Sequence, residues 1–172
     1  MSHGEYCTGR TYSLEGKLSE FNGDNLRNLS RLSYFQSHGC NNANDKKVEE
    51  PSNIYSLMVR NFPISFRKIS NGQKIKTNKY NWKIMISLGH FPKHINLYND
   101  IENMLISSDM ILPKITSHIG VFPNEPNGNT LDAFLKSLVE FKTLPRNVRE
   151  YPPRIESFEV IIKRITPLEI HH

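Results

Sequence analysis

The sequence predicts a mixed α/β fold, with a helical segment first, a β-meander next and a long helix after it. In residues 24–36, leucines and a phenylalanine recur at the spacing of one helix face. Between residues 66 and 107, short apolar runs alternate with turn residues, which is typical of antiparallel strands. From residue 130 to 141 the apolar residues return to helical spacing, and Asp132 stands where the helix dipole favours an acid.

The individual elements are expected in a definite order along the chain. Residues 12–21 and 24–36 form a helical hairpin broken at Asn22-Gly23, and residues 41–63 hold a short helix and an extended connection. Strands follow at 66–69, 74–76, 82–86, 95–98 and 104–107, the first two being joined by a turn at 70–72. Residues 113–129 are irregular, a helix with Thr130 as N-cap runs to about Leu144, and the apolar run 158–162 forms a last strand.

The same pattern predicts the domain organisation. One domain covers residues 1–148, with a helical segment over 1–50 and a β-meander plus helix over 60–148. Residues 149–172 form a divergent tail that begins with charged residues and a double proline. A chain of 172 residues is long enough for one domain with a hydrophobic core and too short for two comfortable ones.

Charge and cysteine content narrow the classes of function. The net charge of +5 is scattered, and Lys46-Lys47 runs directly into Glu49-Glu50. A solvated surface is the better interpretation, and a nucleic-acid partner is not expected. Cys7 and Cys40 are too few for a disulfide framework or a zinc finger. Because the sequence has neither the ~18 apolar residues of a membrane span nor a signal-peptide pattern, we expect a cytoplasmic protein without membrane contact.

The stretch SLGHFPKHINLY, residues 87–98, contains two histidines four positions apart. On a helix, residues at that spacing share one face and can bind one metal ion. Gly89 and Pro92 interrupt this stretch, however, and indicate a strand, a tight turn and a second strand. A metal site at His90 or His94 would therefore be built on a loop.

Four stretches taken in order resemble a known family. They are WKIMISLGH (82–90), FPKHINLY (91–98), NMLISSDMILPKI (103–115) and FPNEPNGNTLDAFLKSLVEFKTLP (122–145). The series is similar to the C-terminal half of metallo-β-lactamase-fold hydrolases, and MSHGEYCTGRTYSL with the first helices resembles the helical middle of the same subgroup. The ordered series, which covers residues 60–148, is specific, although either ligand motif alone would be weak.

The resemblance implies two ligands for a zinc cofactor. In that family a Gly-His-[Ser/Thr]-Pro-x-His loop supplies one ligand through its first histidine, which falls on His90. A Ser-Gly-Asp motif one strand later supplies a carboxylate, which falls on Asp109. Phe91 and Ser108 depart from the residues usual at their positions. Gly89 allows the sharp turn from which His90 can project, and both ligands would follow neighbouring strand ends.

Most of the family's metal ligands have no counterpart in this sequence. The signature His-x-His-x-Asp-His, which supplies three further ligands and an acidic general base, does not occur. The closing histidine of a Pro-x-His-Gly turn is also absent, because the sequence departs from the family after Val148. Two ligands leave a tetrahedral zinc ion half coordinated, so we expect poor occupancy. The family's αββα sandwich packs two sheets together, so we expect a partial sandwich with an uncovered inner sheet face and marginal stability.

Three functional hypotheses follow, and the sequence leaves open whether the chain is an enzyme. The first is a truncated or degenerate metallo-β-lactamase-fold hydrolase without independent activity, whose ancestor hydrolysed an ester, thioester or phosphodiester with zinc. The second is a subunit of a split hydrolase that an N-terminal fragment completes, with self-association through the uncovered sheet face as another route to assembly. The third is a small basic binding module.

The remaining histidines are given simpler roles. The alternative for His90 is a loop histidine bonded locally, and that for Asp109 is a turn carboxylate. His94 is expected to support the site rather than to bind metal, and His118 is expected on the surface of the irregular segment. No motif includes His3 or His38, and His171-His172 is interpreted as a frayed terminus.

Overall fold

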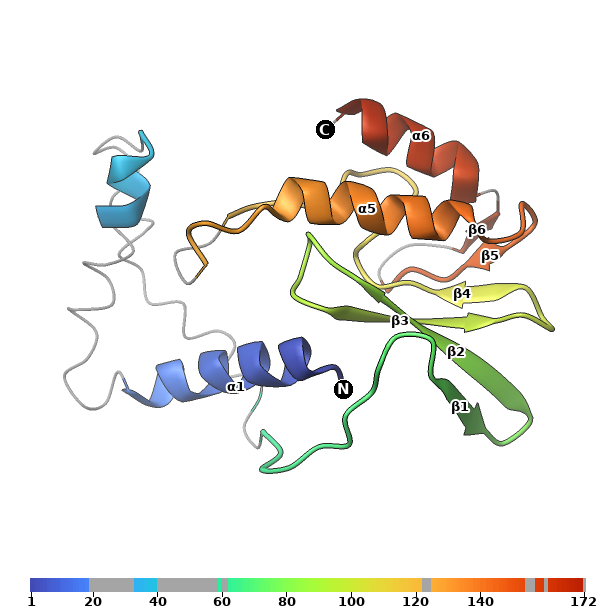
Figure 1. Ribbon diagram of the computed structural model, residues 1–172, viewed down its shortest axis with the longest axis horizontal. Helices are drawn as coiled ribbons and strands as arrows, with labels where there is room; N and C mark the ends of the chain where they lie inside the picture. Colours follow the sequence, from blue (N-terminus) through green and yellow to red (C-terminus); the bar gives the residue numbers. More distant parts are fainter. Residues whose placement is uncertain are drawn as a thin grey trace. The chain divides into compact units, whose positions relative to one another are not determined.

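The structure is a computed structural model, and it describes residues 1–18, 33–39, 59, 62–121, 125–153, 157–159 and 161–171. The chain divides into two compact units. The larger unit holds residues 1–5, 67–121 and 127–172, and the smaller one holds residues 6–66 and 122–126. The sheet and the two C-terminal helices belong to the larger unit (Figure 1).

The helices and strands follow the order expected for the mixed α/β fold, with a helix, a β-meander and then a long helix. In chain order they are α1 (His3–Leu18), β1 (Lys74–Thr77), β2 (Tyr80–Ser87), β3 (His94–Asn99), β4 (Met104–Ile106), α5 (Thr130–Lys142), β5 (Arg149–Glu150), β6 (Phe158–Glu159) and α6 (Ile161–His171). The predicted strands at 82–86, 95–98 and 104–107 and the predicted helix from residue 130 are confirmed to within two residues at each end.

The strands form one six-stranded sheet in the order β1-β2-β3-β4-β5-β6. Strands β1 to β4 are an antiparallel meander, β4 and β5 run parallel, and β5 and β6 are antiparallel. The parallel pair needs a crossover connection, and α5 provides it. β2 and β4 therefore end at the same end of the sheet, where β3 begins.

Each face of the meander is defined by its pairing register. Met85 lies opposite Asn96 and Tyr98 lies opposite Leu105, and we call the face that they share the helix-covered face. Ile84 lies opposite Leu97, which lies opposite Ile106, and these residues define the opposite face. Successive side chains of a strand point to alternate faces, so the two sets do not mix.

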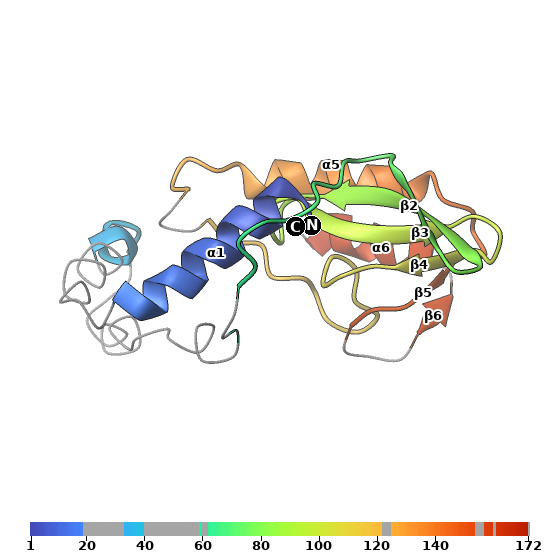
Figure 2. The same cartoon turned by 90° about the horizontal axis from the view of Figure 1, so that it is seen from below.

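Helices α5 and α6 both cover the helix-covered face (Figures 1 and 2). Their buried residues recur at helical spacing and pack with the strands into one core. Six described residues of these helices have side chains that are at most 1% exposed: Phe134, Leu138, Phe141, Ile161, Ile165 and Leu168. This single core, rather than the helical segment at the start of the chain, holds the larger unit together.

The first helix begins earlier than the apolar spacing of the sequence predicts. Ser2 Oγ accepts a hydrogen bond from Glu5 N, and Glu5 Oε2 accepts one from Ser2 N, both at 3.0 Å. This reciprocal pair is a capping box, which satisfies two backbone donors that a helix start leaves unpaired. α1 therefore starts at His3, nine residues before the predicted start at Tyr12.

In the smaller unit, fewer predictions can be compared with the structure, because many of its residues lie outside the described ranges. The Tyr6 ring stacks on Phe66 with centroids 4.0 Å apart, and the Tyr6 hydroxyl donates to the carbonyl of Ile64 at 2.7 Å. Residues 33–37 are helical, which agrees with the end of the helix predicted for 24–36. The rest of that helix, the break at Asn22-Gly23 and the short helix expected within 41–63 lie outside the described residues.

Three local predictions are wrong. Residues 66–69 are not a strand, and the segment after them runs beside β2 because Gly72 N donates to Ile84 O at 2.8 Å and Asn71 Oδ1 accepts from Ile86 N at 2.9 Å. The expected strand at 158–162 ends at Glu159, since Ile161 already begins α6. The N-cap of α5 is Asn129, whose Oδ1 accepts from Asp132 N at 3.3 Å, rather than Thr130.

Residues 149–172, expected to form a divergent tail, supply two strands of the sheet and a helix of the core. β5 pairs with β4, and Ile161, Ile165 and Leu168 of α6 are fully buried. Among the described residues, no helix combines the length and the apolar character needed to cross a membrane.

Candidate metal centre

The candidate site lies at the end of the sheet where β2 and β4 finish and β3 starts. His90 follows β2, His94 is the first residue of β3, and Asp109 lies three residues after β4. The register thus brings residues that are 19 positions apart in the sequence to one place.

Gly89 fixes the direction of the loop that carries His90. Its φ of +104° lies in a region that L side chains rarely adopt. A Cβ at this position would also lie 2.7 Å from Cα of Phe134 in α5. Nearby, Leu88 N donates to Ser137 Oγ of the same helix at 2.9 Å. The loop is therefore held against α5, and only glycine allows so close an approach.

His90 and Asp109 face each other across this end of the sheet. His90 Nε2 and Asp109 Oδ2 are 4.0 Å apart, and both side chains are partly buried, at 22% and 23% exposure. His90 Nδ1 lies 2.8 Å from the carbonyl oxygen of His118. Because a carbonyl only accepts, Nδ1 carries the proton, and a neutral ring then has its lone pair on Nε2. This arrangement matches metal-binding histidines, whose second nitrogen is commonly bonded to a carbonyl.

Asn96 connects the Asp109 loop to the sheet, a role that the sequence analysis missed. Its side chain is fully buried and donates to Met85 O at 3.1 Å and to Ser87 Oγ at 2.9 Å. Its Oδ1 accepts from Ser108 N at 3.3 Å, and Ser108 Oγ donates to Ile95 O at the same distance. The serine in place of glycine before Asp109 is thus accommodated by a hydrogen bond. The only sequence signal was an asparagine at an inward strand position.

His94 and Glu5 complete the group of titratable side chains at this end of the sheet. Glu5 Oε1 accepts from Ile95 N at 3.0 Å, which brings the start of α1 beside β3. Burial is the largest influence on the pKa of His94, and it lowers this pKa. The Glu5 carboxylate raises the pKa in part. Smaller contributions come from His90, which lowers the pKa, and from Asp109, which raises it. Its Nδ1 is buried without a hydrogen-bond partner within the described ranges. The supporting role expected of His94 stays a prediction.

The arrangement fits a metal ion in part. The separation of 4.0 Å between Nε2 and Oδ2 is less than twice the usual zinc–ligand distance of about 2.1 Å, so one ion can contact both atoms. A zinc site needs at least three protein ligands. No group of three or more His, Cys, Asp or Glu side chains suited to a metal is found in the part of the chain that the structure describes. His90 and Asp109 therefore fit as two ligands, without completing a site.

The other histidines lie away from this pair or act through their backbone. The His118 side chain is exposed, and the link to His90 runs through its carbonyl oxygen. His38 is exposed in the smaller unit and bonds to Tyr34 O at 2.7 Å. His171 closes α6, so the expectation of a frayed terminus is wrong for this residue, and His172 lies outside the described residues.

Comparisons with solved structures identify the fold of this chain. No protein-family model and no curated protein matches the sequence. A β-lactamase domain protein from Burkholderia ambifaria has a similar solved structure, with a TM-score of 0.80 and 27% identity over the whole chain. A metallo-β-lactamase family protein from Thermus thermophilus matches the whole chain with a TM-score of 0.73 and 18% identity. A metallo-β-lactamase from Staphylococcus aureus matches 63% of the chain with a TM-score of 0.50 and 16% identity.

These matches cover only part of each known protein. The chain spans 45% of the Burkholderia protein, 51% of the Thermus protein and 36% of the Staphylococcus protein. These extents are consistent with the C-terminal portion that the motifs predict. The chain therefore has the metallo-β-lactamase fold over about half the length of its solved neighbours.

Proposed function

We propose that this chain supplies His90 and Asp109 as two ligands of the metal site of a metallo-β-lactamase-fold hydrolase, and that its residues alone do not catalyse hydrolysis. The observation that carries the proposal is the 4.0 Å approach of Nε2 to Oδ2, with the other nitrogen of His90 anchored on the His118 carbonyl. In an ion pair with Asp109, by contrast, the His90 ring would carry a proton on both nitrogens and would have no lone pair for a metal.

The chemistry of such a site defines the reaction class. Zinc bound there would lower the pKa of a water molecule and polarise a carbonyl or phosphoryl oxygen, which suits hydrolysis of an ester, thioester or phosphodiester. This chain's contribution is to hold two donors at a fixed separation at the sheet end, through Gly89 and Asn96. The missing ligands would come from a separate segment that carries His-x-His-x-Asp-His.

Metal binding by the purified chain tests the assignment of the ligands. Titration with Co²⁺, followed by its visible absorption, should show weak binding, because a site with two protein ligands leaves most positions to water. His90→Ala and Asp109→Asn should each abolish that binding. His38→Ala is the matched control, since it removes an imidazole from the other unit and should leave binding unchanged. Binding that survives both site variants would refute the assignment.

The split form of the proposal has its own test. The chain is co-purified with a separately produced fragment of a related protein that bears His-x-His-x-Asp-His, and zinc content and thioester hydrolysis are measured. We expect both to rise above those of either piece, and His90→Ala to remove the gain. Hydrolysis by the isolated chain would refute the statement that its residues are inactive alone. Absence of association and of zinc uptake would refute the split form.

A further inference from the structure

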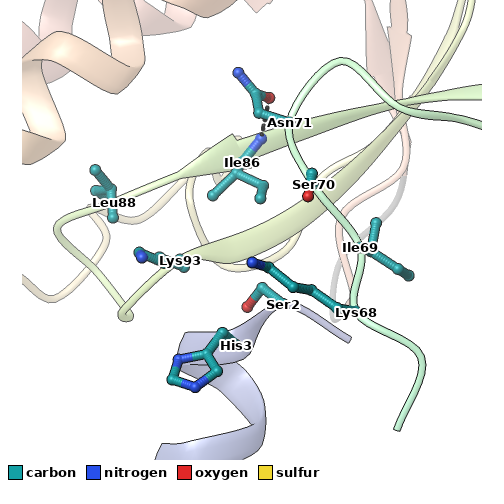
Figure 3. Close-up of a pocket in the computed structure, with 9 residues that line it drawn as sticks. All are labelled: Ser2, His3, Lys68, Ile69, Ser70, Asn71, Ile86, Leu88 and Lys93. Carbon is teal, nitrogen blue, oxygen red and sulfur yellow. Dashed lines mark hydrogen bonds between the residues drawn. The ribbon is translucent and has the colours of Figure 1, made fainter.

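A second candidate site lies beside the start of α1 and does not depend on the metal centre. The larger unit contains a pocket of about 530 Å³. Its lining comes from the start of α1, the segment before β1, the end of β2 and the loop before β3. These residues are Ser2, His3, Lys68, Ile69, Ser70, Asn71, Ile86, Leu88 and Lys93 (Figure 3). The volume is within the range of about 300–1,000 Å³ typical of small-molecule sites.

The charges around this pocket have one sign. Lys68 and Lys93 both line it, and among the described residues no carboxylate does. Figure 3 shows the Lys68 side chain extended into the pocket, with its amine on the side of Lys93. Neither lysine forms an ion pair with an acid within the described residues. The nearest acid of α1, Glu5, directs its two oxygens to the backbone amides of Ser2 and Ile95.

The start of α1 borders the pocket, and the Glu5 carboxylate that is bonded to Ser2 N there offsets part of the positive end of the helix dipole. The amide dipoles of a helix are equivalent to about half a positive charge at its N-terminus, which favours anions there. Ser2 and His3, at the start of the 16-residue helix α1, line the pocket. Lys93, which also lines the pocket, has a φ of +55°, a backbone conformation that lysine seldom adopts.

Beside the polar Ser70 and Asn71, the remaining lining consists of three aliphatic side chains. Ile69 and Ile86 are partly buried, and Leu88 is 39% exposed although it is a large aliphatic residue. Asn71 Oδ1 accepts a hydrogen bond from Ile86 N, which links the segment before β1 to β2 along this side of the pocket. A ligand that matches the pocket thus needs an anionic group for the lysines and an apolar part for the three aliphatic side chains.

We propose that this pocket binds a small amphipathic anion, in which a carboxylate or phosphate group is attached to a short apolar chain. The anionic group would lie between Lys68 and Lys93, and the apolar chain would contact Ile86 and Leu88. The proposal does not rest on the metal centre, because no lining residue is one of the two candidate ligands.

Nuclear magnetic resonance titrations of the full chain test this proposal. Hexyl phosphate and hexanoate are the two anionic probes, hexanol is the neutral probe, and inorganic phosphate is the head group alone. We expect one anionic probe or both to shift the amide signals of Ser70, Leu88 and Lys93 in a saturable way, and hexanol to bind at least tenfold more weakly. Raising the salt concentration should weaken anion binding, since exposed charges are screened. Equal binding of hexanol would overturn the proposal.

Variants separate the pocket from a general effect of charge. The double variant Lys68→Gln with Lys93→Gln should weaken hexyl phosphate binding at least tenfold. Lys114→Gln with Lys163→Gln is the matched control, because it removes two exposed lysines outside the lining and should leave binding unchanged. Leu88→Ala should weaken hexyl phosphate without affecting inorganic phosphate. Equal losses in the two double variants, or no loss in the first, would contradict the proposal.

Discussion

The two faces of the sheet differ in how completely this chain buries them. On the helix-covered face, Met85 and Leu105 are at most 3% exposed under α5 and α6. On the opposite face Ile84 is also fully buried, but Leu97 is only partly buried and Ile106 is 42% exposed. Partly buried Ile75, Ile86, Ile95 and Met104 extend this second surface.

The helix-covered face therefore contributes mainly to folding, whereas the opposite face is a partly open surface. Burial of apolar surface stabilises by about 25 cal/mol per Å², so the helix-covered face carries most of the folding free energy. Contiguous apolar surface left partly open is typical of a surface that another protein segment covers. We propose that the opposite face receives a complementary fragment or a second copy of this chain.

The largest effect is expected from the core of the helix-covered face. Phe141 of α5 is 1% exposed, and Phe141→Ala should lower the free energy of unfolding by about 3–5 kcal/mol through lost burial and a new cavity. Urea denaturation followed by circular dichroism measures this. Val139→Ala on the same helix is the control, because Val139 is 57% exposed and its truncation should cost under about 0.5 kcal/mol. Equal losses would show that α5 is not packed as described.

The junction between α5 and the His90 loop should be nearly as sensitive. Gly89→Ala places a Cβ against Phe134 at a backbone angle unfavourable to alanine, and we expect a loss of about 2–4 kcal/mol. Gly72→Ala is a useful comparison, since Gly72 also has a positive φ of +74° but no heavy atom lies within 4 Å of its added Cβ. It should lose only about 1 kcal/mol. If the two variants behaved alike, the close approach of α5 to this loop would be wrong.

The helix-covered face also contains an acid, Glu150 of β5. It is fully buried beside Leu105, Ser107 Oγ donates to its Oε1, and its Oε2 is buried with no hydrogen-bond partner among the described residues. Burial raises the pKa of Glu150 from 4.5 to about 8, against a smaller opposite effect of the Ser107 hydrogen bond. Because the folded chain then holds a proton that the unfolded chain releases, stability present below pH 4.5 is lost as the pH rises to 8.

Glu150→Gln tests this coupling. Between pH 6 and 8 the wild-type chain should lose about 2 kcal/mol of unfolding free energy that the variant keeps. Denaturation in urea at a series of pH values measures the difference. Glu159→Gln, at an exposed residue of the neighbouring strand β6, should leave the pH dependence unchanged. A wild-type chain whose stability does not fall over this range would show that Glu150 has a charged partner or access to water.

The core of the helix-covered face also shows which elements the sequence could predict and which it could not. The strands 82–86 and 95–98 and helix α5 were predictable because their apolar periodicity coincides with their burial. α6 was not, because Pro167 lies inside the helix and the residues before it suggest a strand. The packing of Ile165 and Leu168 in the core overrides that local signal.

The candidate site shows a similar division. His90 and Asp109 could be singled out because each lies in a motif that carries the resemblance, and the structure brings the two side chains within 4.0 Å of each other. The support from Asn96, the carbonyl of His118 and the Glu5 carboxylate was not predictable, because it depends on register and on contacts between distant segments. The capping box Ser2-x-x-Glu5 was visible in the sequence and would have given the correct start of α1.

The smallest effect on folding, and the most direct test of the opposite face, is expected from Ile106→Lys. Because Ile106 is 42% exposed, the free energy of unfolding should change by under about 1 kcal/mol. A lysine amine on this face would have to be desolvated in any tight contact, so association with a second copy or a complementary fragment should fall at least tenfold in sedimentation experiments. Ile101→Lys, in the turn before β4 and 73% exposed, adds the same charge away from this face and should leave association unchanged. Equal losses in both variants would attribute association to net charge and would contradict the role proposed for the opposite face.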